Sequence, residues 1–206
     1  MSAFNTANER DLLKSRGLQY HPDLVIVHFV LNDVEPDIFK EGPKVEFFED
    51  YLALYQQPDR LSEYSRLWGW LRQRYLRSVL GRTYIEQSLN SYRSDASKFR
   101  QCFEALQDIQ HICRKNNISL LVVIFPFFYD LDGSYPFLPI HEQIRKACHD
   151  AGIPVLDLLP FYRRYHGPEL WVHPVDQHPN EIAHEIAARA MYDYLSGHTE
   201  YGLSRR

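Results

Sequence analysis

The sequence predicts an α/β fold in which helices cover a parallel sheet. Three short apolar runs rich in β-branched residues indicate buried strands: LVIVHFV (24–30), LLVVIFP (120–126) and IPVLDL (153–158). Segments with helical periodicity separate these runs, and such alternation favours parallel strands joined by right-handed crossovers. The chain has 206 residues, enough for a sizeable core, so we interpret residues 1–206 as one domain.

The first helix is expected over residues 5–17, before the first strand. Thr6 followed by Glu9 three residues later is typical of a capping box at a helix start. Gly17 is a typical stop signal, because glycine tolerates the left-handed conformation that often ends a helix.

Three further helices are expected, at 94–115, 139–151 and 180–195. Pro139 and Gly152 are typical of the start and the end of the second of these. The apolar stripes that predict the other two are Phe99, Phe103, Leu106 and Ile109, and Ile182, Ile186, Ala190 and Tyr194.

Residues 35–93 do not fit the alternation of strand and helix, and we interpret them as a helical insertion after the first strand. The segment YSRLWGWLRQRYLRSVLGR (64–82) is aromatic and basic. The stripe of Trp68, Leu71, Tyr75 and Val79 favours a helix that packs on the core. A lid, or a helix that lies on a membrane surface, is the alternative.

Composition excludes some classes of function. Hydrophobic residues make up 45 % and charged residues 24 %, as in an ordinary globular protein, and the net charge of −4 gives no electrostatic case for nucleic acid. The longest apolar runs are too short to span a bilayer, and the first residues lack the apolar core of a signal peptide. As written, the chain is expected to be cytoplasmic, unless a signal or anchor precedes Met1 in a longer form. Cys102, Cys113 and Cys148 are interpreted as reduced thiols.

The stretch VDQHPNEIAH (175–184) directly precedes the last predicted helix. Pro179 favours a helix start and places His178 on an exposed turn. Asp176, two residues earlier, can accept the imidazole Nδ1–H, which leaves the other nitrogen free as a general base. The alternative is a capping turn in which Asp176 or Asn180 accepts free backbone N–H groups.

Asn32 in LND (31–33) follows the first strand. Its side-chain amide can donate to a developing oxyanion, or it can satisfy backbone groups in a turn. Functional groups in open α/β sheets gather at the carboxyl ends of strands. We therefore expect Asn32 and the 176–178 pair to meet in space. The loop after the second strand adds Asp130 and Asp132 to the same end of the sheet.

FVLND after a strand, followed by DQHPNEIAH before the last helix, resembles the SGNH (GDSL-like) hydrolase family. The segment SAFNTANERDLLKSRGLQYHPDLVIVHF resembles the region around that family's glycine block, and FPFFYDLDGSYPF resembles a loop of a bacterial branch. The resemblance covers about residues 2–34 and 95–196. It implies a three-layer α/β/α sandwich with a parallel, flavodoxin-like sheet.

The resemblance also implies a function. It suggests an esterase for acyl or acetyl esters, including those on carbohydrates or lipids, that needs no cofactor. By this resemblance His178 is the general base, Asp176 its orienting acid, and Asn32 and Ala3 oxyanion-hole donors. His184 would be structural.

The sequence departs from the family pattern at two places. Ala3 stands where the family has glycine, and no Gly-Asp-Ser turn carries the nucleophilic serine. We therefore expect an N-terminally truncated form in which the first strands of the sheet are missing. Residues 24–30 would then be an unpaired edge, and the isolated chain would be inactive.

Three other interpretations were weighed. The chain can be an inactive interaction protein of the same fold, docking through a helix at 60–80 or through the exposed edge strand. A metal site from His173, His178 and His184 is disfavoured, because spacings of five and six residues do not share a helical face. A nucleotide binder would need a glycine-rich phosphate loop, which the sequence lacks.

Overall fold

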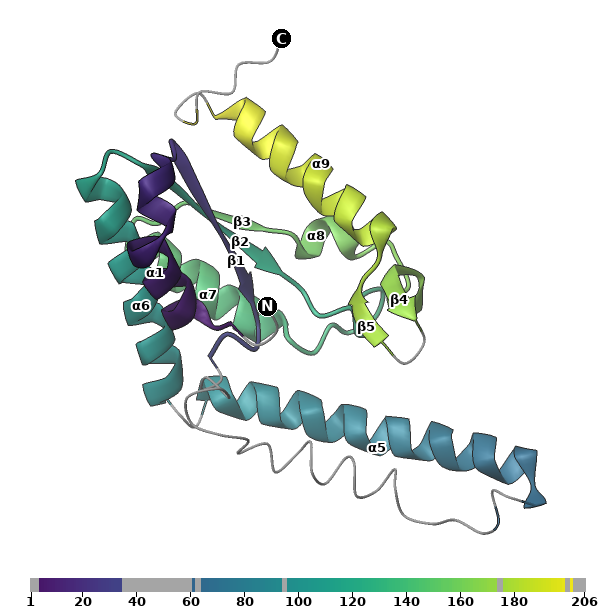
Figure 1. Cartoon of the computed structure of the whole chain (residues 1–206). Coiled ribbons are helices and arrows are strands. Elements are labelled where there is room, and N and C mark those ends of the chain that lie inside the picture. The colour runs from purple at the N-terminus through teal and green to yellow at the C-terminus, as the bar shows by residue number, and fades with distance from the viewer. Residues whose placement is uncertain are drawn as a thin grey trace.

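The chain forms a mixed α/β structure around a parallel three-stranded sheet. A computed structural model describes residues 4–34, 61, 64–93, 96–173, 176–198 and 201. The sheet has the order β1 (Leu24–Val30), β2 (Ser119–Phe125) and β3 (Val155–Asp157) (Figure 1). β1 and β2 pair along their whole length, from Leu24 opposite Ser119 to Val30 opposite Phe125. The three predicted strands and their parallel direction are thus confirmed.

The helices follow the predicted order, and a small antiparallel hairpin precedes the last one. The further elements are α1 (Thr6–Ser15), η1 (Gly17–Tyr20), α5 (Arg66–Arg93), α6 (Ala96–Lys115), α7 (Leu138–Asp150), α8 (Leu159–Tyr162), η2 (Gly167–Leu170), β4 (Trp171–His173), β5 (Asp176–Pro179) and α9 (Glu181–Gly197). β4 and β5 form the hairpin. In Figure 1, α1, α6 and α7 lie on one side of the sheet and α9 lies on the other.

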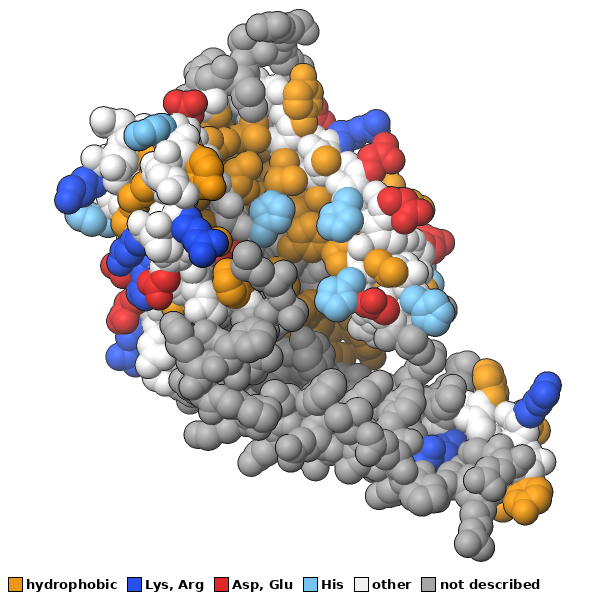
Figure 2. Space-filling model, viewed as in Figure 1, with side chains coloured by type: hydrophobic (Ala, Val, Ile, Leu, Met, Phe, Trp, Pro, Cys, Tyr) orange, Lys and Arg blue, Asp and Glu red, His pale blue; other side chains and the backbone are white. Residues whose placement is uncertain are grey.

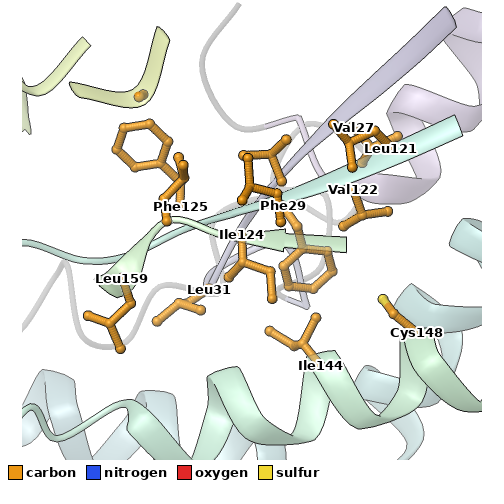
Figure 3. Packing of buried hydrophobic residues seen from close by; sticks show 14 of the residues in the cluster. Val27, Phe29, Leu31, Leu121, Val122, Ile124, Phe125, Ile144, Cys148 and Leu159 are labelled. Atoms are coloured by element: carbon orange, nitrogen blue, oxygen red, sulfur yellow. The ribbon is translucent and has the colours of Figure 1, made fainter. Parts of the chain in front are cut away.

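The core is centred on β2, whose residues 120–125 are all buried. Ile144 and Cys148 of α7 point toward the sheet, where Phe29 and Ile124 meet them (Figure 3). The three cysteines are buried and free, as predicted. Burial raises the pKa of the Cys102 and Cys148 thiols to about 12, so both stay protonated at neutral pH.

β1 is buried on one face only. Val27 and Phe29 are 4 % and 1 % exposed, whereas Ile26 is 37 % exposed and His28 is also exposed. In the parallel register Ile26 of β1 lies opposite Leu121 of β2, which is completely buried. Other parts of the chain therefore cover this face of the sheet at β2 but not at β1. Figure 2 shows apolar surface in the middle of this view, with histidine side chains beside it. The prediction that both faces of the first strand are covered is wrong.

The start of α1 differs from the predicted capping box. Asn5 is the N-cap, and its side chain accepts the backbone N–H of Asn8 at 3.1 Å. Thr6 lies inside the helix, completely buried, and its hydroxyl lies 3.3 Å from Cys102 Sγ on α6. Thr6 is therefore not the N-cap: its side chain packs against α6, and Asn5, one residue earlier, supplies the capping oxygen.

α9 corresponds to the helix predicted over residues 180–195, and Asn180 caps it, as the capping alternative proposed. Pro179 belongs to β5, and Asn180 caps the helix by accepting the Ala183 N–H at 3.0 Å. Of the predicted stripe, Ala190 is buried and Ile186 and Tyr194 pack against the core, whereas Ile182 is 45 % exposed. The residues that α9 buries are Ala183, Ala187, Ala190 and Leu195.

α5 is a 28-residue helix within the predicted insertion, of which residues 35–60 lie outside the described part. The Tyr92 hydroxyl near its end is buried and donates to the Leu31 carbonyl at 3.0 Å. Trp68, Leu71 and Tyr75 are 44 %, 45 % and 68 % exposed. The prediction that these three side chains pack on the core is therefore wrong. The Val79 side chain is outside the described part. No helix among the described residues is both long and apolar enough to cross a membrane.

Candidate functional site

The β4–β5 hairpin carries the predicted catalytic pair. Trp171 pairs with Pro179, and His173 pairs with Asp176. The hairpin lies at the end of the sheet where β1 and β2 end (Figure 1). Asn180 anchors its base, because its backbone N–H donates to the Leu170 carbonyl and its side-chain amide donates to the Glu169 carbonyl, both at 2.9 Å. The short strand, and not a helix start as predicted, therefore holds His178 in place.

Asp176 and His178 form a hydrogen-bonded pair. His178 Nδ1 lies 2.5 Å from Asp176 Oδ1, and the same oxygen accepts the backbone N–H of His178 at 3.1 Å. The hydrogen bonds from the His178 side chain and backbone lower the pKa of the Asp176 carboxyl below its ordinary value. An ionised carboxylate on Nδ1 leaves the proton there and presents the lone pair of Nε2 outward. The imidazole is 85 % exposed, so the second nitrogen is accessible.

Asn32 lies on the turn directly after β1. Its neighbours Leu31 and Asp33 are buried, while Asn32 is exposed. Asp33 closes this turn, since its carboxylate accepts the Val30 N–H at 2.9 Å and its own N–H donates to the Val30 carbonyl at 2.9 Å. Both of these hydrogen bonds are made by Asp33, and neither involves the side-chain amide of Asn32.

The predicted site residues are brought together only in part. Asp176 and His178 touch, but no hydrogen bond joins Asn32 to either of them among the described residues. Ala3 lies outside the described residues. His184 is exposed on the first turn of α9. Burial and, to a smaller extent, the charge of the nearby His184 lower the pKa of His28 on β1.

The loop between β2 and α7 contacts the segment that leads into the hairpin. Its Phe128 carbonyl accepts the Trp171 indole N–H at 3.0 Å. Asp132 Oδ2 lies 3.3 Å from Nδ1 of His166, which is the N-cap of η2. The loop is therefore joined at two points to the segment that leads into the hairpin.

A buried polar cluster behind this loop was missed by the sequence analysis. His141 Nδ1 lies 2.8 Å from Asp157 Oδ1, and His141 Nε2 lies 3.3 Å from the Tyr135 hydroxyl. Part of the signal was available, because Asp157 lies near the carboxyl end of the strand predicted over residues 153–158. His141 sits in an apolar helical stripe and carries no such signal.

Other kinds of site have less support among the described residues. No three His, Cys, Asp or Glu side chains of that part of the chain are grouped as metal ligands would be. A hollow of about 350 Å³ lies between α8 and α9, lined by side chains that include Phe161, Arg164 and Arg189. It contains neither the Asp176–His178 pair nor Asn32, so it belongs to a different part of the surface.

Comparisons of the chain with protein-family models, with curated proteins and with solved structures returned no match.

Proposed function

We propose that this chain carries the base half of an SGNH/GDSL-type ester hydrolase site. The observation that carries the proposal is the 2.5 Å contact between Asp176 Oδ1 and His178 Nδ1 at the end of the sheet where β1 and β2 end. A histidine held in one tautomer by a carboxylate is the base–orienter half of an acyl-transfer triad. Asn32, exposed at the same end, is proposed as an oxyanion donor.

The proposed reaction is the hydrolysis of an acyl or acetyl ester. His178 Nε2 takes the proton of a serine hydroxyl while the serine oxygen attacks the ester carbonyl. The alcohol leaves with that proton and an acyl-serine forms. Water, deprotonated by His178, then releases the acid and the free serine. The Asn32 amide and, by resemblance, the Ala3 backbone N–H would stabilise the oxyanion in both steps.

The proposal requires a serine that these 206 residues do not supply in a Gly-Asp-Ser turn. We propose that the serine belongs to a strand–turn segment beside β1, which would complete a three-layer α/β/α sandwich. Two observations support this arrangement. β1 is hydrogen-bonded to β2 alone within the described chain, and the exposed face of β1 carries Ile26 and His28.

Extension of the reading frame upstream of Met1 tests the proposal. The extended protein should hydrolyse an aryl acetate such as 4-nitrophenyl acetate, and His178→Ala should lower kcat/KM by at least about 1,000-fold, the usual loss when a triad base is removed. Equal rates for the extended wild type and its His178→Ala variant would overturn the proposal.

His149→Ala is the matched control. His149 is also an exposed histidine beside an aspartate, with Nδ1 3.5 Å from Asp150 Oδ1, but it lies at the end of α7. Its removal should leave the rate unchanged. An equal loss in both variants would indicate a general effect of histidine removal and not a catalytic role.

A second candidate function is favoured by the surface of α5. Trp70 and Tyr75 are 55 % and 68 % exposed, and with Leu67, Trp68 and Leu71 they form an apolar surface of the kind that marks interaction sites. A non-catalytic interaction protein of the same fold would use this helix for docking. An extended protein without esterase activity that retains this helix would favour the second function.

A further inference from the structure

His141, Asp157 and Tyr135 form a buried polar cluster, and the contact between His141 Nδ1 and Asp157 Oδ1 indicates where the imidazole carries a proton. Asp157, at the end of β3, is 10 % exposed in its side chain, and Oδ1 accepts the Leu159 N–H at 2.9 Å. Arg145 Nε lies 3.5 Å from Oδ2. The Asp157 carboxylate thus accepts from the Leu159 N–H and lies beside the Arg145 guanidinium. Because an ionised carboxylate can only accept, Nδ1 of His141 carries a proton and donates to it.

The other nitrogen of His141 binds the loop between β2 and α7. The imidazole is completely buried, and its Nε2 lies 3.3 Å from the Tyr135 hydroxyl, within hydrogen-bond distance. Tyr135 is itself 5 % exposed. Buried polar groups that are fully paired hold one arrangement, because any other leaves a donor or acceptor unsatisfied. The cluster therefore fixes the loop to α7 and β3.

The same loop supports the segment that leads into the hairpin. The Phe128 carbonyl accepts the Trp171 indole N–H at 3.0 Å, and the Gly133 carbonyl accepts from Arg163 at 3.2 Å. A Cβ on Gly167 would lie only 2.4 Å from the Phe128 oxygen, which shows how closely the two backbones approach. Trp171 in turn pairs with Pro179, the residue after His178.

We propose that Tyr135, His141 and Asp157 form a positioning network for the His178 hairpin. The network fixes the loop, the loop fixes Trp171 and Gly167, and these fix the hairpin on which His178 stands. The description of His178 as a base rests on the proposed function, but the mechanical link from Tyr135 to the hairpin does not. None of the three residues is proposed to touch substrate, since all three side chains are buried or nearly so.

Tyr135→Phe in the full 206-residue chain tests the link, because it removes one hydroxyl and keeps the ring. Amide hydrogen exchange over residues 167–180 should become about five- to tenfold faster, as expected for the loss of one buried hydrogen bond, while exchange in α6 changes less. The His178 imidazole NMR signal, assigned by its absence in His178→Gln, should shift or broaden. Asp157→Asn should reproduce both effects and serves as the second variant.

Tyr92→Phe is the matched control. It also removes a buried hydroxyl, one that donates to the Leu31 carbonyl at 3.0 Å, but on α5. It should leave the His178 signal and the 167–180 amides unchanged. The proposal is overturned if Tyr135→Phe leaves both readouts as in wild type, or if Tyr92→Phe changes them equally. Failure of the esterase assay alone would overturn the proposed function and leave this link standing.

Discussion

At the residue scale, the Asp176–His178 pair and Glu9 show opposite effects of solvent on a carboxylate. Asp176 is exposed and hydrogen-bonded to His178, and its pKa is lowered. Glu9, on the first helix, has a buried Oε2 atom with no hydrogen-bond partner among the described residues, and burial raises its pKa from the ordinary 4.5 to about 7. Hydrogen bonds thus favour the charged form of Asp176, whereas burial disfavours the charged form of Glu9.

Glu9→Gln should stabilise the protein at pH 8 and have little effect at pH 4. Because the folded-state pKa of Glu9 lies above the unfolded one, folding loses stability as pH rises from about 4.5 to 7, and the penalty remains above pH 7. Glutamine removes this ionisation, so the free energy of unfolding at pH 8 should rise by about 1–3 kcal/mol. Urea unfolding at both pH values measures it.

Glu104→Gln is the control for that substitution, because Glu104 is exposed on α6. It should change the free energy of unfolding little at either pH. A stabilisation of Glu9→Gln that is equal at pH 4 and pH 8 would contradict the electrostatic origin, since the charge is absent at the lower pH.

At the scale of elements, the three strands of the sheet and the helices α6, α7 and α9 were predicted close to their observed bounds, but the β4–β5 hairpin was not predicted. β1 was predicted over the residues that form it, because β-branched side chains pack well on the pleated surface of a sheet and a short apolar run of this kind is typical of a buried strand. Thr6 and Pro179 were misplaced because a cap depends on which neighbour is buried, and that is decided by tertiary contacts. The exposed stripe of α5 was misinterpreted for the same reason: helical periodicity does not say what the helix packs against.

Gly167→Ala should destabilise the junction between η2 and the β2–α7 loop. The new Cβ would lie 2.4 Å from the Phe128 carbonyl oxygen, a backbone atom that can move only if the loop moves. We expect a loss of about 1–3 kcal/mol in the free energy of unfolding, as for other overpacked sites. Thermal and urea unfolding provide the measurement.

Gly197→Ala is the matched control at the end of α9, where no atom of the described residues, apart from the chain neighbours and the backbone of the same helix, lies within 4 Å of the added Cβ. It should be neutral or stabilising by about 0.5–1 kcal/mol, because alanine restricts the unfolded chain more than glycine does. Equal destabilisation by the two substitutions would contradict the steric argument for Gly167.

At the scale of the whole molecule, only those contacts of the candidate site that join residues close together in the sequence could be predicted. The Asp176–His178 pair lies within three residues, so the spacing alone indicated their contact. The Tyr135–His141–Asp157 network joins a loop, a helix and a strand, and no local pattern encodes such a contact. The position of Asn32 at the end of the sheet where the hairpin lies followed from the rule that the carboxyl ends of parallel strands lie at the same edge of the sheet.

Within the described residues, β1 has an unpaired edge and an exposed face, and these lead to a prediction about self-association. Within the described chain β1 pairs only with β2, and its seven residues contain no lysine or proline, the residues that commonly protect edge strands. The chain should therefore associate as its concentration rises, with β1 of one copy against β1 of another. Ile26→Lys places a charge on the exposed face and should shift the protein toward monomer in light scattering after gel filtration.

Ile182→Lys separates an edge effect from a general gain in charge. Ile182 is 45 % exposed and Ile26 is 37 % exposed, so the two substitutions remove similar apolar surface and add the same charge, one on α9 and the other on the edge strand. If the edge drives association, only Ile26→Lys should raise the monomer fraction at a given concentration. Equal effects of both, or a wild type that stays monomeric throughout, would contradict association through β1. A strand paired to β1 in an extended form should suppress association in the same way as Ile26→Lys, because it occupies the same hydrogen-bonding edge.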